Sequence, residues 1–114
     1  MQTILSMSFN VKTIAVFERQ AKRLIKKYPS LKGELNQLIQ SLKVNPKHGI
    51  SIGNGCFKIR LHIASKGKGK SGGARVITYL HIVNTTVYLL NIYDKSEKES
   101  ISEKELRELI VNIK

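Results

Sequence analysis

The sequence feature that most constrains the fold is the strict alternation of side chains over residues 56–64. Its apolar members are Phe57, Ile59, Leu61 and Ile63, and its basic or titratable members are Lys58, Arg60 and His62. Successive side chains of a β-strand point to opposite faces, so this period of two predicts a strand with one buried and one basic face. Such a strand belongs in a sheet whose apolar face is covered by other elements.

Further strands are indicated by runs of β-branched and aromatic side chains. The predicted strands cover residues 8–12, 56–64, 75–83 and 87–93, and the predicted loops cover residues 47–55 and 65–73. Asn84 and Thr85 stand where a tight hairpin turn is expected. Strands that follow one another through hairpins form an antiparallel sheet.

Three helices are predicted from apolar side chains at helical spacing, over residues 14–28, 31–42 and 103–113. Pro29 ends the first helix, Ser30 is a candidate cap for the second, and Ser102 with Glu105 fits a capping box before the third. The expected fold is therefore α+β. A small antiparallel sheet of about four strands carries an N-terminal helical hairpin on one face, followed by a C-terminal helix, and the basic strand face is left to solvent.

Length and composition limit the classes of protein. The 114 residues suit a single domain over residues 1–114, in which residues 1–6 look like an extension before the first strand. No apolar run reaches the ~18 residues of a membrane span, and the start shows no secretory signal, so a cytoplasmic protein is expected. The lone Cys56 excludes an intrachain disulfide framework and a cysteine-cluster zinc site. We expect neither a metal nor another cofactor.

The charge is strongly positive and unevenly distributed. Twenty Lys and Arg against eight Asp and Glu give a net charge of +12. Residues 1–75 carry fifteen of these cations and two acids, a net +13, whereas residues 76–114 carry a net −1. Such a field attracts polyanions: nucleic acid, an anionic membrane or an acidic protein partner.

The candidate site residues are four cations and one tyrosine that strand pairing can bring together. Lys58 and Arg60 project side by side at about 7 Å. Arg75 opens the next strand, while Tyr93 and Lys95 stand at the end of the third. Such a cluster binds adjacent phosphates or stabilises the charge of a phosphoryl-transfer transition state. A basic RNA- or DNA-binding face without chemistry remains the alternative.

A second group of cations is predicted to contact the RNA backbone without taking part in chemistry. Its members are Lys66, Lys68 and Lys70 in the lysine–glycine loop and His62 on the basic strand face. Tyr79 and Tyr88 are interpreted as packing residues rather than as platforms on which bases stack.

Three segments resemble the RelE/ParE superfamily of bacterial type II toxin–antitoxin toxins, and most closely its HigB-like, ribosome-dependent branch. They are residues 57–61 (Phe-Lys-Ile-Arg-Leu), residues 65–75, which run from the lysine–glycine loop into Gly-Gly-Ala-Arg, and residues 88–95 (Tyr-Leu-Leu-Asn-Ile-Tyr-Asp-Lys). The resemblance covers nearly the whole chain after Met7. It implies a toxin that cleaves translated mRNA in the ribosomal A site and thereby inhibits translation.

The resemblance also implies roles for the cations in a metal-independent endoribonuclease, in which the ribose 2′-OH attacks the adjacent phosphate. Lys58 and Arg60 match the strand cations of the family, and Arg75 matches the arginine that contacts the reacting phosphate. Lys95 lies where RelE-type members carry another catalytic arginine. Their C-terminal tyrosine falls at Ile101, which cannot move a proton, so either Tyr93 substitutes for it or Lys58 is the base.

The partners that the resemblance implies are a cognate antitoxin, the ribosome with its rRNA, and mRNA. Operator DNA is reached only through the antitoxin complex, and no membrane is involved. Two other functions remain open: a ParE-like poison of DNA gyrase, which needs no catalytic cations, and a non-catalytic RNA-binding protein.

Overall fold

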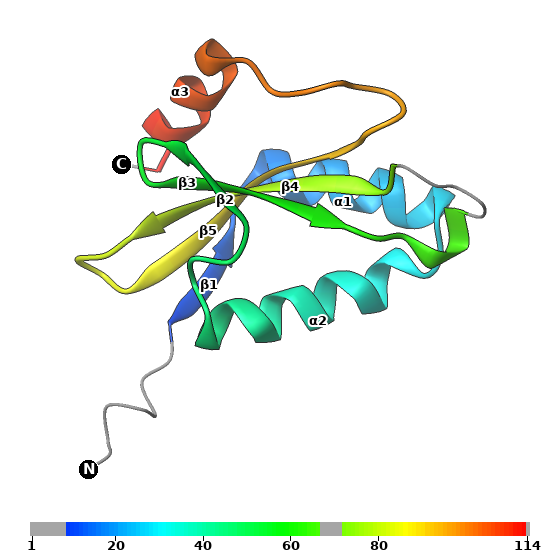
Figure 1. Ribbon diagram of the computed structural model, residues 1–114, viewed down its shortest axis with the longest axis horizontal. Coiled ribbons are helices and arrows are strands. Elements are labelled where there is room, and N and C mark those ends of the chain that lie inside the picture. Colours follow the sequence, from blue (N-terminus) through cyan, green and yellow to red (C-terminus); the bar gives the residue numbers. More distant parts are fainter. Residues whose placement is uncertain (1–8, 67–71, 114) are drawn as a thin grey trace.

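The computed structural model describes residues 9–66 and 72–113, which form three α-helices and one five-stranded sheet (Figure 1). The strands are β1 (Asn10–Thr13), β2 (Ile50–Gly53), β3 (Cys56–Leu61), β4 (Ala74–His81) and β5 (Thr86–Asp94). The helices are α1 (Ala15–Lys27), α2 (Leu31–Val44) and α3 (Glu103–Val111), with a short 3₁₀ turn at Ala64–Lys66. The predicted α+β class is confirmed. Within residues 9–66 and 72–113, no helix has the length and hydrophobicity of a membrane span.

The strand order is β1-β5-β4-β3-β2, so the sheet is larger and more mixed than expected. The pairs β2–β3, β3–β4 and β4–β5 are antiparallel, as predicted for strands joined by hairpins, but β1 pairs with β5 in parallel, with Val11 opposite Val87. A parallel partner requires a long crossover connection. Nothing in the local pattern of residues 8–12 identifies such a distant partner.

The interpretation of residues 47–55 as a loop was wrong at Ile50–Gly53, which forms β2 and pairs with β3. The many glycines suggested irregular structure. Asn54 and Gly55 instead turn the chain between the strands, both with positive φ (55° and 79°). Two consecutive residues with positive φ are typical of a type I′ hairpin turn, which favours Asn-Gly.

The first face of the sheet packs against α1 and α2. Its core contains Phe17, Leu24, Leu31, Leu42, Ile59, Val76 and Leu89, all at most 3% exposed. The chain reverses at Pro29, as predicted. The candidate cap Ser30 does precede α2, but its side chain does not cap the helix; its hydroxyl contacts Ser65 and Glu34 instead.

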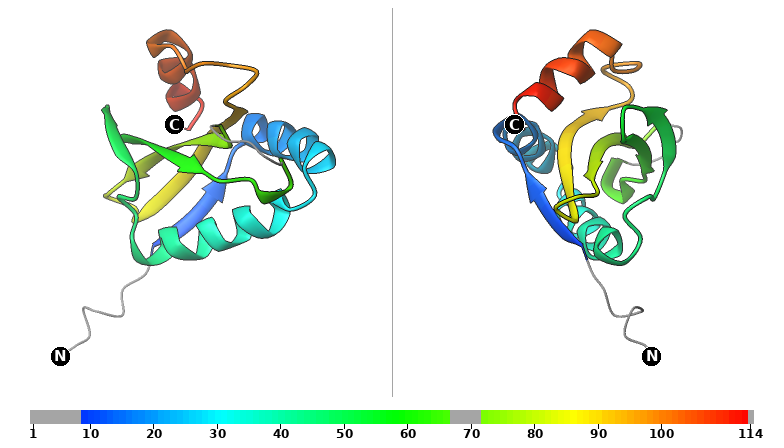
Figure 2. Two further views of the ribbon diagram at one scale, coloured as in Figure 1. Left: turned by 45° about the vertical axis from the view of Figure 1, so that its right-hand side comes forward. Right: turned by 90° about the vertical axis from the view of Figure 1, so that its left-hand side faces the viewer.

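The second face of the sheet is partly covered by α3, whereas the basic strand face was expected to be open. The connector at residues 95–102 leads from β5 to α3, which lies on the side of the sheet away from α2 (Figure 2). The predicted capping box is confirmed, with hydrogen bonds in both directions between Ser102 and Glu105. Apolar residues of α3 explain this cover, because Leu106 and Leu109 pack on Cys56, Ile77 and Leu90.

Candidate functional site

Three of the predicted site residues lie in one row across the sheet. Arg60 in β3 is opposite Arg75 in β4, and Arg75 is opposite Tyr93 in β5. Directly opposed residues of antiparallel strands project from the same face with Cβ atoms about 4.5–5.5 Å apart. The fold therefore gathers two arginines and a tyrosine that lie up to 33 positions apart in the sequence.

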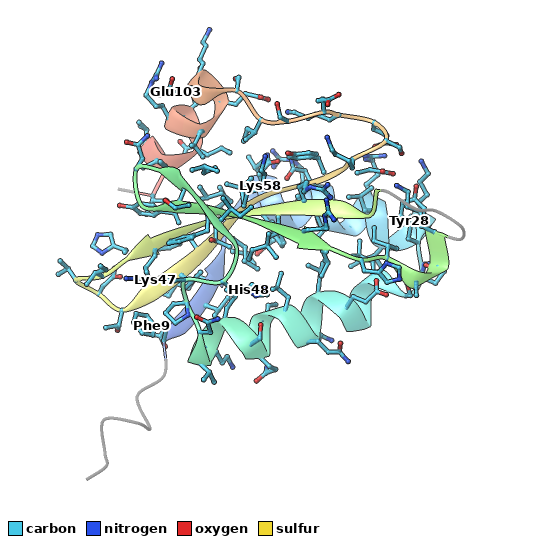
Figure 3. The ribbon with its side chains drawn as sticks, in the orientation of Figure 1. Phe9, Tyr28, Lys47, His48, Lys58 and Glu103 are labelled. Atoms are coloured by element: carbon cyan, nitrogen blue, oxygen red, sulfur yellow. The ribbon has the colours of Figure 1, made fainter. Side chains whose placement is uncertain are left out.

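Lys58 lies on the same face, two residues before Arg60 and opposite Ile77. Figure 3 shows it above the sheet, on the side that carries α3. Its side chain lines a cavity of about 230 Å³ together with residues of the β2–β3 hairpin and the start of α3, among them Asn54, Ser102 and Glu103. Lys58 thus marks the boundary between the arginine row and the part of the face that α3 covers.

The Arg75 guanidinium is held by main-chain oxygens rather than by acids. Its Nη1 donates hydrogen bonds to the carbonyl oxygens of Gly72 (2.9 Å) and Ala74 (3.2 Å), and the residue is 9% exposed. Among the described residues, no carboxylate lies within 4.0 Å of the charged nitrogens of Lys58, Arg60 or Arg75. Within that part of the chain, their positive charge has no counter-ion.

Tyr93 is 5% exposed, and its buried hydroxyl has no hydrogen-bond partner among the described residues. Burial raises the pKa of this phenol, and the nearby charge of Arg75 opposes only part of that effect. The hydroxyl is therefore protonated at neutral pH. The Lys98 ammonium lies 5.8 Å from the centre of the Tyr93 ring. Ile101, the position at which the resemblance places a tyrosine, packs against the apolar cluster that contains Tyr93.

The remaining predicted cations at this end of the sheet have acidic partners. Lys95 donates to the carbonyl oxygen of Glu99 (3.0 Å) and lies 3.5 Å from its carboxylate, at an exposed position. Lys66, predicted to contact RNA, places its amine 2.8 Å from the carboxylate of Asp94, and that side chain is fully buried. Lys68 and Lys70 lie outside the described residues.

Asp94 is a residue that the sequence analysis did not single out. Its carboxylate accepts hydrogen bonds from Lys66 Nζ, from Tyr28 Oη (2.7 Å), and from Ser96 through both its backbone N (2.9 Å) and its Oγ (2.7 Å). Burial alone would raise the pKa of this carboxyl, but these hydrogen bonds outweigh burial and hold the pKa well below its usual value. Only its place at the end of a strongly apolar strand could have drawn attention to it.

His62 lies apart from the arginine row. It is exposed and lines an open groove of about 470 Å³ between β3 and α2, together with Arg60, Glu34 and His48. Arg60 thus belongs to the row and is also one of the residues at this groove. Figure 3 shows His48 at the α2 side of the sheet. Within the described residues, no three His, Cys, Asp or Glu side chains gather closely enough to hold a metal ion.

The two tyrosines interpreted as packing residues lie against each other. The rings of Tyr79 and Tyr88 stack at 6.3 Å on the face that α3 covers. The chemistry that this face can support is therefore concentrated around the row of Arg60, Arg75 and Tyr93. Cations that no acid neutralises attract a phosphodiester, and a protonated phenol can donate a proton to a leaving oxygen.

Comparison with known proteins identifies a family and two similar folds. Residues 11–111 match the family model described as the RelE toxin of the RelE/RelB toxin–antitoxin system. A free-state structure of an E. coli RelE double mutant is similar, with a TM-score of 0.55, 15% identity, and coverage of 95% of this chain and 100% of that one. The toxin–antitoxin complex RelBE2 of Mycobacterium tuberculosis matches with a TM-score of 0.53, 16% identity, and coverage of 78% and 93%.

Proposed function

This chain belongs to the RelE toxin family of the RelE/RelB toxin–antitoxin system, and we propose that it is a ribosome-dependent mRNA endoribonuclease. It would cleave translated mRNA in the ribosomal A site and so inhibit translation. The finer assignment to a HigB-like branch is part of the proposal. The observation that supports it most directly is the row of Arg60, Arg75 and Tyr93, beside Lys58, with no carboxylate of the described residues close to its cations.

In the proposed reaction the ribose 2′-oxygen attacks the adjacent phosphorus. A base takes the 2′-OH proton, a P–O bond forms to the 2′-oxygen, and the bond to the 5′-oxygen breaks. The leaving 5′-oxygen then takes a proton, so the products are a 2′,3′-cyclic phosphate and a 5′-hydroxyl. Negative charge builds up on the phosphoryl oxygens in the transition state, where nearby cations stabilise it.

The surroundings of each side chain suggest how the roles divide. Arg75, whose guanidinium is held by the Gly72 carbonyl oxygen rather than by an acid, is proposed to stabilise the phosphoryl charge together with Arg60. The raised pKa of Tyr93 suits a proton donor to the leaving oxygen rather than a base. Lys58 is then proposed to be the base that takes the 2′-OH proton. Lys95 is proposed to be an additional cation that contacts the mRNA.

Access to Tyr93 requires movement, because the residue is 5% exposed and is buried in the same cluster as Leu106 and Leu109 of α3. We propose that the connector at residues 95–102 shifts when the protein binds the ribosome. The exposed Arg60 makes the first contact with the mRNA backbone. Lys68, Lys70 and His62 are proposed to contact RNA outside the reacting phosphate, and Lys66 to act at the base of the same loop.

We propose further that a cognate antitoxin neutralises this protein in the cytoplasm, as the RelBE2 complex, a toxin bound to its antitoxin, suggests. The net charge of +12 favours an acidic antitoxin segment as well as rRNA. Contact with operator DNA would pass through the antitoxin.

The experiment is controlled expression in a bacterium, followed by mapping of the 5′ ends of abundant transcripts. We expect cuts inside translated frames that disappear when translation is blocked and in Arg75→Ala. Arg107→Ala, an exposed arginine on α3, is the matched control and should cut like the wild type. Growth arrest with DNA damage and no RNA cuts would instead indicate a gyrase poison, and harmless expression would indicate a non-catalytic RNA-binding protein.

A further inference from the structure

The Asp94 carboxylate joins three segments of the chain. Lys66 lies after β3, Tyr28 directly follows α1, and Ser96 is in the connector to α3. Each donates to this one carboxylate at 2.7–2.9 Å. Asp94 is 0% exposed, so it cannot touch an RNA that binds at the surface. Figure 3 places Tyr28 at the end of the molecule where these segments meet. The carboxylate lies in the residue directly after Tyr93.

Lys66, which pairs with Asp94, also contacts the Gly72–Gly73 turn before β4. Its Nζ is 3.5 Å from the carbonyl oxygen of Gly73, which also accepts a hydrogen bond from the Lys95 backbone N (3.1 Å). A Cβ added to Gly72 would lie 3.0 Å from the same Nζ. Gly72 and Gly73 therefore pass closely around the Lys66 ammonium.

The Gly72–Gly73 turn also contacts the side chain of Arg75. The Gly72 carbonyl oxygen accepts a 2.9 Å hydrogen bond from Arg75 Nη1. Gly73 has a φ of +62°, and a Cβ there would lie 2.4 Å from the Leu61 carbonyl oxygen, so only glycine fits without a shift of the backbone. The Arg75 guanidinium is thus hydrogen-bonded to a turn that also contacts Lys66, the partner of Asp94.

We propose that Asp94 is a positioning residue, whose buried carboxylate holds Lys66 and through it the Gly72–Gly73 turn that orients the Arg75 guanidinium. The proposal deepens the proposed endoribonuclease function and rests on it for its catalytic consequence. The low pKa of the Asp94 carboxyl keeps the group ionised at neutral pH, as this role requires. Asp94 pairs with Lys66 rather than with Arg75, so its carboxylate does not compete with a phosphate for the Arg75 guanidinium.

The main test compares Asp94→Asn with the wild type in cleavage of mRNA on programmed ribosomes. The substitution keeps the shape of the side chain and removes the charge that holds Lys66. A misplaced transition-state contact lowers kcat, so we expect kcat to fall about 10- to 100-fold. KM should change by less than about twofold, because no proposed RNA-contacting cation is removed. Glu97→Gln is the matched control, since Glu97 is a connector acid that pairs with Arg23 and Lys27.

A second readout does not depend on nuclease activity. In NMR spectra of the folded protein, Asp94→Asn should shift the amide signals of Gly72 and Gly73 and the side-chain Nε–Hε signal of Arg75. Glu97→Gln should leave all three signals in place. A folded Asp94→Asn protein with native signals at these positions, or with a kcat within about twofold of the wild type, would overturn the proposal.

Tyr28→Phe covers the case in which Asp94→Asn does not fold, because it deletes only one hydroxyl from the carboxylate's partners. We expect the same three signals to move by less and kcat to fall by a few-fold; unchanged signals would count against the proposal. If the wild-type protein cuts no mRNA, the endoribonuclease function is wrong. The NMR comparison then decides by itself whether Asp94 positions the Arg75 guanidinium.

Discussion

The two faces of the sheet differ in what covers them and in what they contain. Among residues 9–66 and 72–113, the face under α1 and α2 packs fifteen buried residues into one cluster, whereas the face under α3 packs six. The larger cluster is apolar throughout. The smaller one includes Tyr93, whose hydroxyl has no partner among the described residues, and it borders Arg75 and Lys58.

The two faces therefore have different roles: the face under α1 and α2 stabilises the fold, and the face under α3 carries the candidate site. Free energy of unfolding scales with buried apolar area, so most of it should come from the face under α1 and α2. Elements with few buried contacts open locally at lower cost than the whole fold. A site beside a small cluster can therefore be uncovered without unfolding the protein, which suits a face that is proposed to admit mRNA.

The largest expected effect is on the larger cluster. Leu24 in α1 is 0% exposed, and Leu24→Ala should lower the free energy of unfolding by about 2–5 kcal/mol, because it leaves a cavity where α1 meets the sheet. Urea unfolding followed by circular dichroism measures the change. A loss below about 1 kcal/mol would show that this face does not dominate stability.

A smaller loss of stability is expected in the smaller cluster, under α3, where Leu106 is 4% exposed. Leu106→Ala should cost about 1–2 kcal/mol in global unfolding, within the range of ordinary point substitutions, because α3 can detach before the rest of the fold opens. Its main result should be faster labelling of Cys56, the only cysteine of the chain, by a thiol reagent. An unchanged labelling rate would mean that α3 does not control access to this face.

The strand and helix periodicities predicted most of the fold, because each element carries its own pattern of buried and exposed side chains. The alternation at residues 56–64 is enough to place Lys58 and Arg60 on one face of β3. The hairpin between β4 and β5 followed from the turn near Thr85. Local patterns do not identify distant partners, and this explains why the parallel pairing of β1 with β5 was missed. The strand β2 was missed although its partner β3 is its neighbour in the chain, because its surrounding glycines suggested a loop.

The site could be predicted only in part, for the same reason. Lys66 was recognisable as a cation in a lysine–glycine loop, but its ion pair with Asp94 joins residues 28 positions apart. Tyr28 meets the same carboxylate from 66 positions away. No spacing rule reveals such a contact. The cover by α3 was likewise unexpected, since its apolar stripe shows that it packs but not on which face.

A pH titration sharpens the comparison, because Cys56 lies under α3. Burial raises the pKa of its thiol from 9.0 to about 11. A folded-state pKa above the unfolded one contributes stability that is fully present below pH 9.0 and is lost as pH rises toward 11. The free energy of unfolding should therefore fall less steeply over this window in Cys56→Ala than in the wild type. If the free energy of unfolding fell equally steeply with pH in both proteins, the buried Cys56 thiol would not be the cause of the loss.

The smallest expected effect is at the start of α3. Ser102→Ala removes the hydroxyl that accepts the Glu105 backbone N–H at 3.1 Å, and loss of such a cap costs about 1 kcal/mol. Because α3 belongs to the smaller cluster, the loss should appear as faster labelling of Cys56 and leave the urea midpoint nearly unchanged. A midpoint shift as large as that of Leu106→Ala would mean that α3 and the sheet unfold as one unit, and the two faces would then not be separable.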